Sequence, residues 1–214
     1  MTSQLTPLQQ TVLELFFDQE RRFFLTGGGA LCGFYLGHRV TLDLDLFVTE
    51  DVLAEGVSHL RAITQKLSGS LESIQTSPDF RRFLLRALGD TLVIDLVRDR
   101  SPQLFPKQTI VSGIRLDSVE EIFANKLCAL LSRSEIRDLV DLRALEETGL
   151  SLQAMVLKAE RKDAGLTPGQ LGWVLSQIQI GEDAQPPGNV TGNELREYLK
   201  LTVMKLSAMS FPKV

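Results

Sequence analysis

The chain has 214 residues, 43% of them hydrophobic, and a formal net charge of -4. This composition is that of a globular protein able to bury a core in one domain or two small ones. The acidic balance excludes a strongly basic nucleic-acid-binding module, because the overall charge repels phosphate. No stretch reaches the roughly 18 apolar residues that span a bilayer, and the first residues lack the pattern of a secretory signal, so we expect a cytoplasmic protein with no membrane partner.

Helices and strands are expected to alternate over the first hundred residues. Apolar residues at helical spacing predict helices over residues 7–20, 30–37 and 51–67, the first of them capped by Thr6. Apolar alternation and β-rich composition predict strands, which are 22–26, 40–48, 80–88 and 91–99. A two-residue turn of Gly89 and Asp90 is expected to join the last two strands as a hairpin. Between the third helix and this hairpin we expect a loop rich in Ser and Gly.

The second half of the chain is expected to be helical. Prolines in residues 101–108 break any regular element, and helical patterns then continue to a last helix over about 193–208. Helix caps are predicted at three places, which are Ser118 with Glu121, Ser134 and Thr167. We therefore predict a mixed α/β (α+β) domain over residues 1–112 and a C-terminal helical domain over residues 113–214. The two cysteines, Cys32 and Cys128, lie in apolar helical patterns and are interpreted as small buried hydrophobes.

Three aspartates are candidates for a metal site. Asp43 and Asp45 stand two apart on an expected strand, so their side chains leave the sheet on one face with Cα atoms about 6 to 7 Å apart. Asp95 emerges in the middle of another expected strand, among apolar neighbours. Carboxylates this close repel one another unless a cation lies between them, and oxygen ligands suit magnesium or manganese. The alternative is that each aspartate lies in water at a strand end or edge.

The glycine triplet Gly27, Gly28 and Gly29 is expected in a turn between a strand and a helix. Backbone N–H groups at such a turn can cradle phosphate, aided by the helix dipole. The triplet fits neither the P-loop nor the dinucleotide-binding pattern, and its structural alternative is a tight turn. Combined with the aspartates, it predicts a phosphate cradle beside a metal site.

The stretches "LTGGGAL" and "GHRVTLDLDLF" resemble the AbiEii/AbiGii toxin family of nucleotidyltransferases, in the DNA polymerase β-like superfamily. The positions that match the family's first motifs are Gly27, Gly28, Ala30, Leu31, His38, Arg39, Thr41, Asp43 and Asp45. Gly29 departs from the pattern, because the family commonly has Thr or Ser there. A later block, "KLCALLSRSEIRDLVDL", resembles the family's second motif through Lys126, Arg133, Arg137, Asp138 and Asp141. The resemblance covers about residues 20–145, and the remaining residues match only as a helical appendage.

This resemblance implies a nucleotidyltransferase core followed by a helical domain, and transfer of a nucleoside monophosphate from an NTP to an acceptor hydroxyl. It implies two Mg²⁺ ions, or Mn²⁺, held by Asp43, Asp45 and Asp95, with Asp95 accepting the proton of the acceptor. Lys126 would neutralise charge that builds on the phosphates. The positions implied to bind nucleotide or phosphate are Gly27, Gly28, Gly29, His38, Arg39, Thr41, Lys126, Asp138 and Asp141. Family relatives act as toxins beside a separate antitoxin, and tRNA is the acceptor that the resemblance implies.

Several of these residues also have a purely structural interpretation. Lys126 falls inside an apolar helical stripe, where its stem can lie on apolar surface while the ammonium reaches water. Arg137 and Asp141 are spaced as a solvated helical ion pair, with Asp138 on the same helix. His38 and Arg39 either hold the phosphate loop or cap the following strand.

The sequence allows three functions, which differ in the acceptor or in whether the protein is an enzyme. Five arginines around the expected hairpin can follow an RNA backbone or merely solubilise an edge strand, and these are Arg81, Arg82, Arg86, Arg98 and Arg100. An enzyme of the same fold that modifies a small molecule or a protein hydroxyl is the first alternative to an RNA-directed toxin. A non-catalytic nucleotide-binding or antitoxin-like partner is the second, and the presence of all three aspartates argues against it.

Overall fold

The computed structural model describes residues 4–210, which divide into two compact units. The first unit holds the residues up to Ser101 together with Lys107–Ser118, and the second holds Pro102–Pro106 together with the residues from Val119 onward. The first unit is a mixed α/β body and the second is helical, so the expected fold class is confirmed. The division expected after residue 112 falls inside a hairpin, whereas the compact units change after Ser118.

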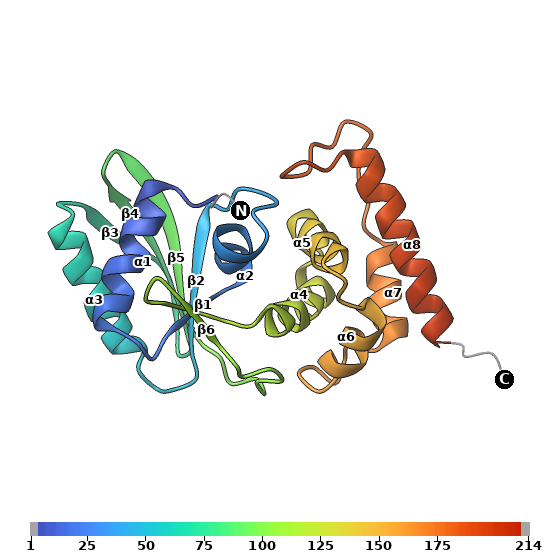
Figure 1. Ribbon diagram of the computed structural model, residues 1–214, viewed down its shortest axis with the longest axis horizontal. Helices are drawn as coiled ribbons and strands as arrows, with labels where there is room; N and C mark the ends of the chain where they lie inside the picture. The colour runs from blue at the N-terminus through green and yellow to red at the C-terminus, as the bar shows by residue number, and fades with distance from the viewer. Residues whose placement is uncertain (1–3, 211–214) are drawn as a thin grey trace. The chain divides into compact units, whose positions relative to one another are not determined.

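One seven-stranded sheet runs through the first unit, in the order β3-β4-β5-β2-β1-β7-β6 (Figure 1). Its strands are β1 (Phe24–Thr26), β2 (Asp43–Val48), β3 (Ser70–Ser77), β4 (Phe80–Ala87), β5 (Asp90–Arg98), β6 (Thr109–Val111) and β7 (Ile114–Leu116). β2 pairs with β5 and β1 with β7 in parallel, and the other neighbours are antiparallel. The sheet is therefore mixed, with β2 and β5 side by side near its middle.

Three helical segments belong to this unit: α1 (Pro7–Gln19), α2 (Gly27–Ala30), which continues into the π-helical turn η1 (Leu31–Tyr35), and α3 (Leu53–Lys66). The expected cap of α1 is confirmed, because the Thr6 hydroxyl accepts from the backbone N–H of Gln9 at 3.2 Å. α1 and α3 lie beside each other on one face of the sheet (Figure 1). A Cβ at Gly56 of α3 would lie 2.7 Å from the ring of Phe23 and 3.3 Å from a methyl group of Leu96, so this face is the apolar one.

Two strands differ from the prediction. One begins later than expected, and the other replaces an expected loop. The strand expected over 40–48 begins only at Asp43, and Val40 and Leu42 are 54% and 77% exposed, because the pairing of β2 with its neighbours starts at Asp43. The loop expected after α3 is instead the edge strand β3. Most residues of β3 are exposed, and the strand pairs with β4 through backbone hydrogen bonds. An exposed edge strand has no buried face, so its sequence lacks the apolar alternation from which a strand is predicted.

The hairpin between β4 and β5 turns one residue earlier than expected. Leu88 and Gly89 both have positive φ, +55° and +77°, and Ala87 pairs with Asp90. Positive φ at both central residues is the signature of a type I′ turn, so the turn residues are Leu88 and Gly89 and not Gly89 and Asp90. β6 and β7 form a second hairpin that the expected helical pattern missed, since strands of three residues are too short for a periodic signal.

The second unit contains α4 (Val119–Arg133), α5 (Ile136–Glu147), α6 (Leu152–Ala159), α7 (Pro168–Ser176) and α8 (Gly192–Ser210). The expected cap of α7 is confirmed, because the Thr167 hydroxyl accepts from the N–H of Gln170 at 3.1 Å. The cap expected at Ser134 is wrong. Glu135 occupies the cap position of α5, and the Ser134 hydroxyl instead donates to the carbonyl of Leu130 at the end of α4.

The cysteines differ in their surroundings, since Cys32 is buried as expected and Cys128 is only partly buried. Among residues 4–210, no helix is long and apolar enough to cross a membrane.

Candidate active site

A line of paired residues crosses four strands of the sheet. Thr26 on β1 is opposite Asp45 on β2, Asp45 is opposite Asp95 on β5, and Asp95 is opposite Arg82 on β4. Residues in register across a sheet point to the same face, and Asp43 shares that face because it stands two residues before Asp45. The structure therefore brings together the three aspartates expected to bind metal, which we call the acidic site (Asp43, Asp45 and Asp95).

The acidic site lies on the face opposite the apolar core. The intervening residues Leu44, Leu46 and Leu96 have no exposed surface, whereas Asp43 and Asp45 are half-buried and Asp95 is 4% exposed. Three carboxylates in such a partly desolvated place repel one another and favour a cation among them. Their ligand atoms are all carboxylate oxygens, the set that Mg²⁺ and Mn²⁺ prefer, so these residues fit a divalent metal.

Arg82 is a member of this site that the sequence interpretation missed. Its Nε and Nη2 donate to the two oxygens of Asp95 at 2.8 and 2.7 Å, a bidentate ion pair. The hydrogen bond with Asp95 raises the pKa of Arg82, and the charges of Asp95, Asp45 and Asp43 raise it further.

The correct position of the hairpin turn would have predicted that Arg82 pairs with Asp95. Residues equally distant from a two-residue turn pair across a hairpin, and with Leu88 and Gly89 at the turn, Arg82 faces Asp95. A turn at Gly89 and Asp90 would have placed Arg82 opposite Val97 instead. The one-residue error in the turn thus hid the pair.

The glycine turn packs directly onto this site. Gly27 has φ +60°, and a Cβ there would lie 2.4 Å from Oδ2 of Asp45. A Cβ at Gly28 would lie 2.9 Å from Nη2 of Arg39 and 3.0 Å from Oγ1 of Thr41. The positive φ and the close approach to Asp45 require glycine at Gly27, and the bare backbone of the turn lies against the acidic site there.

The loop before β2 completes this surface. The Thr41 hydroxyl donates to Oδ1 of Asp43 at 2.8 Å, and Arg39 is 6% exposed with Nη1 donating to the carbonyl of Val40 at 3.0 Å. His38 is half-buried in the same loop. Gly29 is different, because a Cβ there would meet Leu25 in the apolar core rather than a polar group.

Asp117 is a second residue that the sequence interpretation missed. Its fully buried carboxylate accepts from the Thr26 hydroxyl at 2.8 Å, and its carbonyl accepts from the hydroxyl of Tyr35 at 2.8 Å. Thr26 precedes the glycine turn and Tyr35 ends η1, so Asp117 fixes both ends of the segment that contains the turn. No pattern in the sequence indicates this role.

The later motif forms what we call the buried charge cluster (Lys126, Asp138 and Asp141, with Arg133 at its exposed edge), all within the second unit. Nζ of Lys126 lies 2.8 Å from Oδ1 of Asp138 and 2.6 Å from Oδ2 of Asp141. Arg133 donates from Nε to Oδ2 of Asp138 at 2.8 Å. Lys126 is 6% exposed and both aspartates have no exposed surface. Lys126 is therefore not a lysine whose ammonium reaches water.

Charge compensation decides the protonation of this cluster. Burial alone would lower the pKa of Lys126, but the charges of Asp141 and Asp138 outweigh it and raise that pKa. Burial alone would likewise raise the pKa of Asp138, and the hydrogen bond from Arg133 with the charge of Lys126 lowers it. Each charge is thus maintained by its neighbours. Arg137 is half-buried, with Nε 2.6 Å from a carboxylate oxygen of Glu135.

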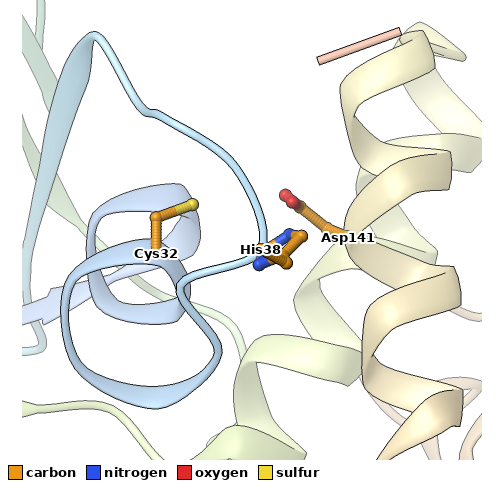
Figure 2. A group of neighbouring side chains, drawn as sticks. All are labelled: Cys32, His38 and Asp141. Carbon is orange, nitrogen blue, oxygen red and sulfur yellow. The ribbon is translucent and has the colours of Figure 1, made fainter. Parts of the chain in front are cut away.

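Figure 2 shows three other side chains of metal-ligand type. Cys32 comes from η1 and His38 from the loop before β2, both in the first unit, whereas Asp141 comes from α5 in the second. These residues do not form a ligand set within one folded body. The carboxylates that the first unit places on one face of its sheet are those of the acidic site.

Comparison with protein families assigns the chain to a family. A family model for the nucleotidyl transferase AbiEii toxin of type IV toxin–antitoxin systems matches residues 14–201. The chain belongs to the AbiEii family. The resemblance inferred from the glycine and aspartate motifs is thereby confirmed, and the family is described as one of nucleotidyl transferase toxins.

Solved structures of similar fold support the same architecture for this AbiEii chain. JHP933 from Helicobacter pylori is 21% identical with a TM-score of 0.58, and the match covers 95% of this chain and 92% of that one. The nucleotidyltransferase toxin MenT4 from Mycobacterium tuberculosis H37Rv is 15% identical with a TM-score of 0.62, over 94% of this chain and 82% of that one. No curated protein sequence matches the chain. At these identities the structural likeness shows the fold alone.

Proposed function

We propose that this AbiEii protein transfers a nucleoside monophosphate from an NTP to an acceptor hydroxyl at the acidic site, with RNA, and tRNA first, as the acceptor. The observation that carries the proposal is the position of Asp43, Asp45 and Asp95 on one face, against the bare backbone of Gly27 and Gly28. Carboxylates for a metal and backbone N–H groups for phosphate are the parts that phosphoryl-type transfer requires.

The three aspartates would hold two Mg²⁺ ions, or Mn²⁺. When bound, such ions would supply positive charge that stabilises the negative charge developing during transfer. The backbone of Gly27, Gly28 and Gly29 orients the phosphates, with Arg39 and Thr41 beneath the turn, and His38 belongs to the same loop. Asp95 accepts the proton of the acceptor hydroxyl.

Lys126 is proposed to contact the triphosphate, together with Asp138 and Asp141 as nucleotide-binding residues. This role rests on the resemblance of the motif. The ammonium of Lys126 is bound by both aspartates within its own unit, and its three N–H donors are compatible with a phosphate contact in addition to these two partners. The electrostatic contribution would come from a positive charge where negative charge develops in the transition state.

The hairpin arginines support an RNA acceptor less than the sequence suggested. Four of the five are paired with carboxylates, in the pairs Arg82–Asp95, Arg86–Glu72, Arg98–Asp51 and Arg100–Asp79. Paired arginines offer less positive charge to an RNA backbone. This pairing and the net charge of -4 favour, as the second candidate, a small-molecule or protein hydroxyl as the acceptor.

The proposal is tested by incubating the protein with each labelled NTP, Mg²⁺ and one of three acceptors: total RNA, total protein or a small-molecule extract. Label in the RNA supports the first candidate, and label in another fraction supports the second. Asp45→Asn should reduce transfer by more than about a hundredfold while the circular dichroism spectrum stays that of the parent, since it removes a metal ligand. Full activity of Asp45→Asn, or no transfer to any fraction, would overturn the proposed function.

Toxicity and a separate antitoxin belong to the same proposal. Expression in a host without the antitoxin should slow growth, and Asp43→Asn should relieve the effect because the chemistry is lost. If both forms slow growth equally, the toxicity has a cause other than catalysis.

A further inference from the structure

Arg82 holds Asp95 in a fixed orientation. Both carboxylate oxygens accept a hydrogen bond from the guanidinium, and the side chain of Asp95 is only 5% exposed. A bidentate pair fixes the plane of the carboxylate, yet each oxygen keeps further acceptor capacity. Asp95 is therefore oriented by Arg82 without being fully occupied by it.

The arginine itself is held by its strand. Arg82 lies within β4, in register with Asp95, and its guanidinium carbon is 5.5 Å from the ring centroid of Phe80, which stands two residues earlier on the same face. A side chain fixed at both its backbone and its tip places its charge at a defined point. Arg82 thus differs from an arginine that moves freely at the surface.

The charge of Arg82 acts on the whole acidic site. Arg82, Asp95 and Asp45 stand in register on three neighbouring strands, and Asp43 stands two residues before Asp45. The guanidinium therefore lies on the same face of the sheet as all three carboxylates. The interaction is mutual, and a fixed positive charge there opposes the arrival of any further cation. A triphosphate brings negative charge that reverses this opposition.

We propose that Arg82 is a positioning residue that acts through Asp95, and that it keeps the acidic site from binding a divalent metal tightly until a nucleotide is present. The inference rests on the proposed function, since it takes the acidic site as the metal site. Arg82 serves as the resident cation of the site, and metal loading becomes dependent on the nucleotide that the reaction needs.

The test measures Mn²⁺ binding to the full chain without nucleotide, from the electron paramagnetic resonance signal of free Mn²⁺. Arg82→Gln should tighten Mn²⁺ binding about tenfold or more, because one positive charge leaves the site. The kcat of transfer should fall in the same variant, because Asp95 loses its orientation. Adding NTP should tighten Mn²⁺ binding strongly in the parent and much less in Arg82→Gln.

Arg86→Gln is the matched control for Mn²⁺ binding. Arg86 stands on the same strand and face, and its Nη1 lies 2.9 Å from a carboxylate oxygen of Glu72, with both side chains about half exposed. Its removal should leave the Mn²⁺ affinity within about twofold of the parent, because solvent screens its charge. An equal tightening in Arg86→Gln would show a general effect of surface charge and overturn the inference.

Arg82→Lys separates charge from geometry and also serves if Arg82→Gln does not fold. Lysine keeps the charge but loses the two-pronged contact, so Mn²⁺ affinity should stay within about threefold of the parent while kcat falls and KM for the NTP changes little. Arg82→Lys with parental kcat would overturn the positioning role. Unchanged Mn²⁺ affinity in a folded Arg82→Gln would overturn the effect on metal binding.

The failure of this inference is distinguishable from the failure of the proposed function. Mn²⁺ binding that tightens in Arg82→Gln and is lost when Asp45→Asn is added, in a protein that transfers no nucleotide, overturns the proposed function and leaves the inference standing. Nucleotide transfer with Mn²⁺ binding insensitive to Arg82 overturns the inference alone.

Discussion

The acidic site and the buried charge cluster use the same residue types in opposite ways. The buried charge cluster pairs two carboxylates with two cations, Lys126 and Arg133, and both of its aspartates are fully buried. In the acidic site, the guanidinium of Arg82 pairs with Asp95, while Asp43 and Asp45 stand on the same face and keep some exposure. Complete burial demands charge balance within the protein, since an uncompensated buried charge is strongly destabilising. A site with an excess of carboxylates is suited to receive a cation from outside.

The largest expected effect in this comparison comes from removing Lys126, the buried cation of the cluster. Lys126→Met keeps the length of the side chain and leaves Asp138 and Asp141 facing each other without the ammonium between them. Breaking a buried ion pair from one side costs about 3–5 kcal/mol, so the free energy of unfolding should fall by that amount in urea denaturation. Lys205→Met is the control, because Lys205 pairs at the surface with Glu146 and should cost less than about 1 kcal/mol.

Retention of parental stability in Lys126→Met would mean that the two aspartates are not compensated by this lysine. The original alternatives for Lys126, a triphosphate contact or a stem with its ammonium in water, both predict a variant as stable as the parent. The structure reverses that expectation, because the ammonium already has two anionic partners.

Neutralising one aspartate in each region should have opposite effects on stability. Asp138→Asn leaves Lys126 and Arg133 with one carboxylate fewer in a buried place, and should lower the free energy of unfolding by about 2–4 kcal/mol. Asp45→Asn relieves repulsion among carboxylates, so stability should stay the same or rise by less than about 1 kcal/mol. Thermal and urea unfolding measured without added metal compare the two. A larger loss of stability in Asp45→Asn than in Asp138→Asn would contradict the contrast between the two regions.

The smallest expected effect is the dependence of stability on pH. Arg133 and Lys126 lower the pKa of Asp138 in the folded protein despite its burial. The contribution of Asp138 to the free energy of unfolding is therefore present above the ordinary pKa of 3.8 and is lost as the pH falls through the lower pKa of the folded protein. Asp141 and Asp138 raise the pKa of Lys126 in the folded protein despite its burial. The contribution of Lys126 to the free energy of unfolding is therefore present below the ordinary pKa of 10.5 and is lost as the pH rises through the pKa of the folded protein.

Urea midpoints across pH therefore should fall at both acidic and alkaline extremes, with a plateau between. Asp138→Asn should flatten the acidic fall relative to the parent. An equally steep acidic fall in that variant would assign the effect to other carboxylates.

Local rules were sufficient where neighbouring residues decide the structure. The cap at Thr6 before Pro7 and the cap at Thr167 before Pro168 each place a hydroxyl next to the helix that it caps, and both are found as expected. The two-residue spacing of Asp43 and Asp45 put both carboxylates on one face for the same reason, since the period of a strand is a local property. The glycine turn and its place beside the aspartates were likewise indicated by the sequence motif.

Tertiary structure alone decided which partners those side chains have. Arg82 was grouped with arginines for RNA, because its pairing with Asp95 depends on the turn residue of the hairpin, and a shift of one residue at the turn changes every partner along both strands. Lys126 has the spacing of a residue on an apolar stripe, and only the packing of α5 against α4 brings two carboxylates to its ammonium. Asp117 is remote in sequence from Thr26 and had no periodic signal at all. Sequence by itself determined which face carries each charge, because that follows from strand and helix period. The charge balance around each group was decided by contacts between distant segments, which no local pattern encodes.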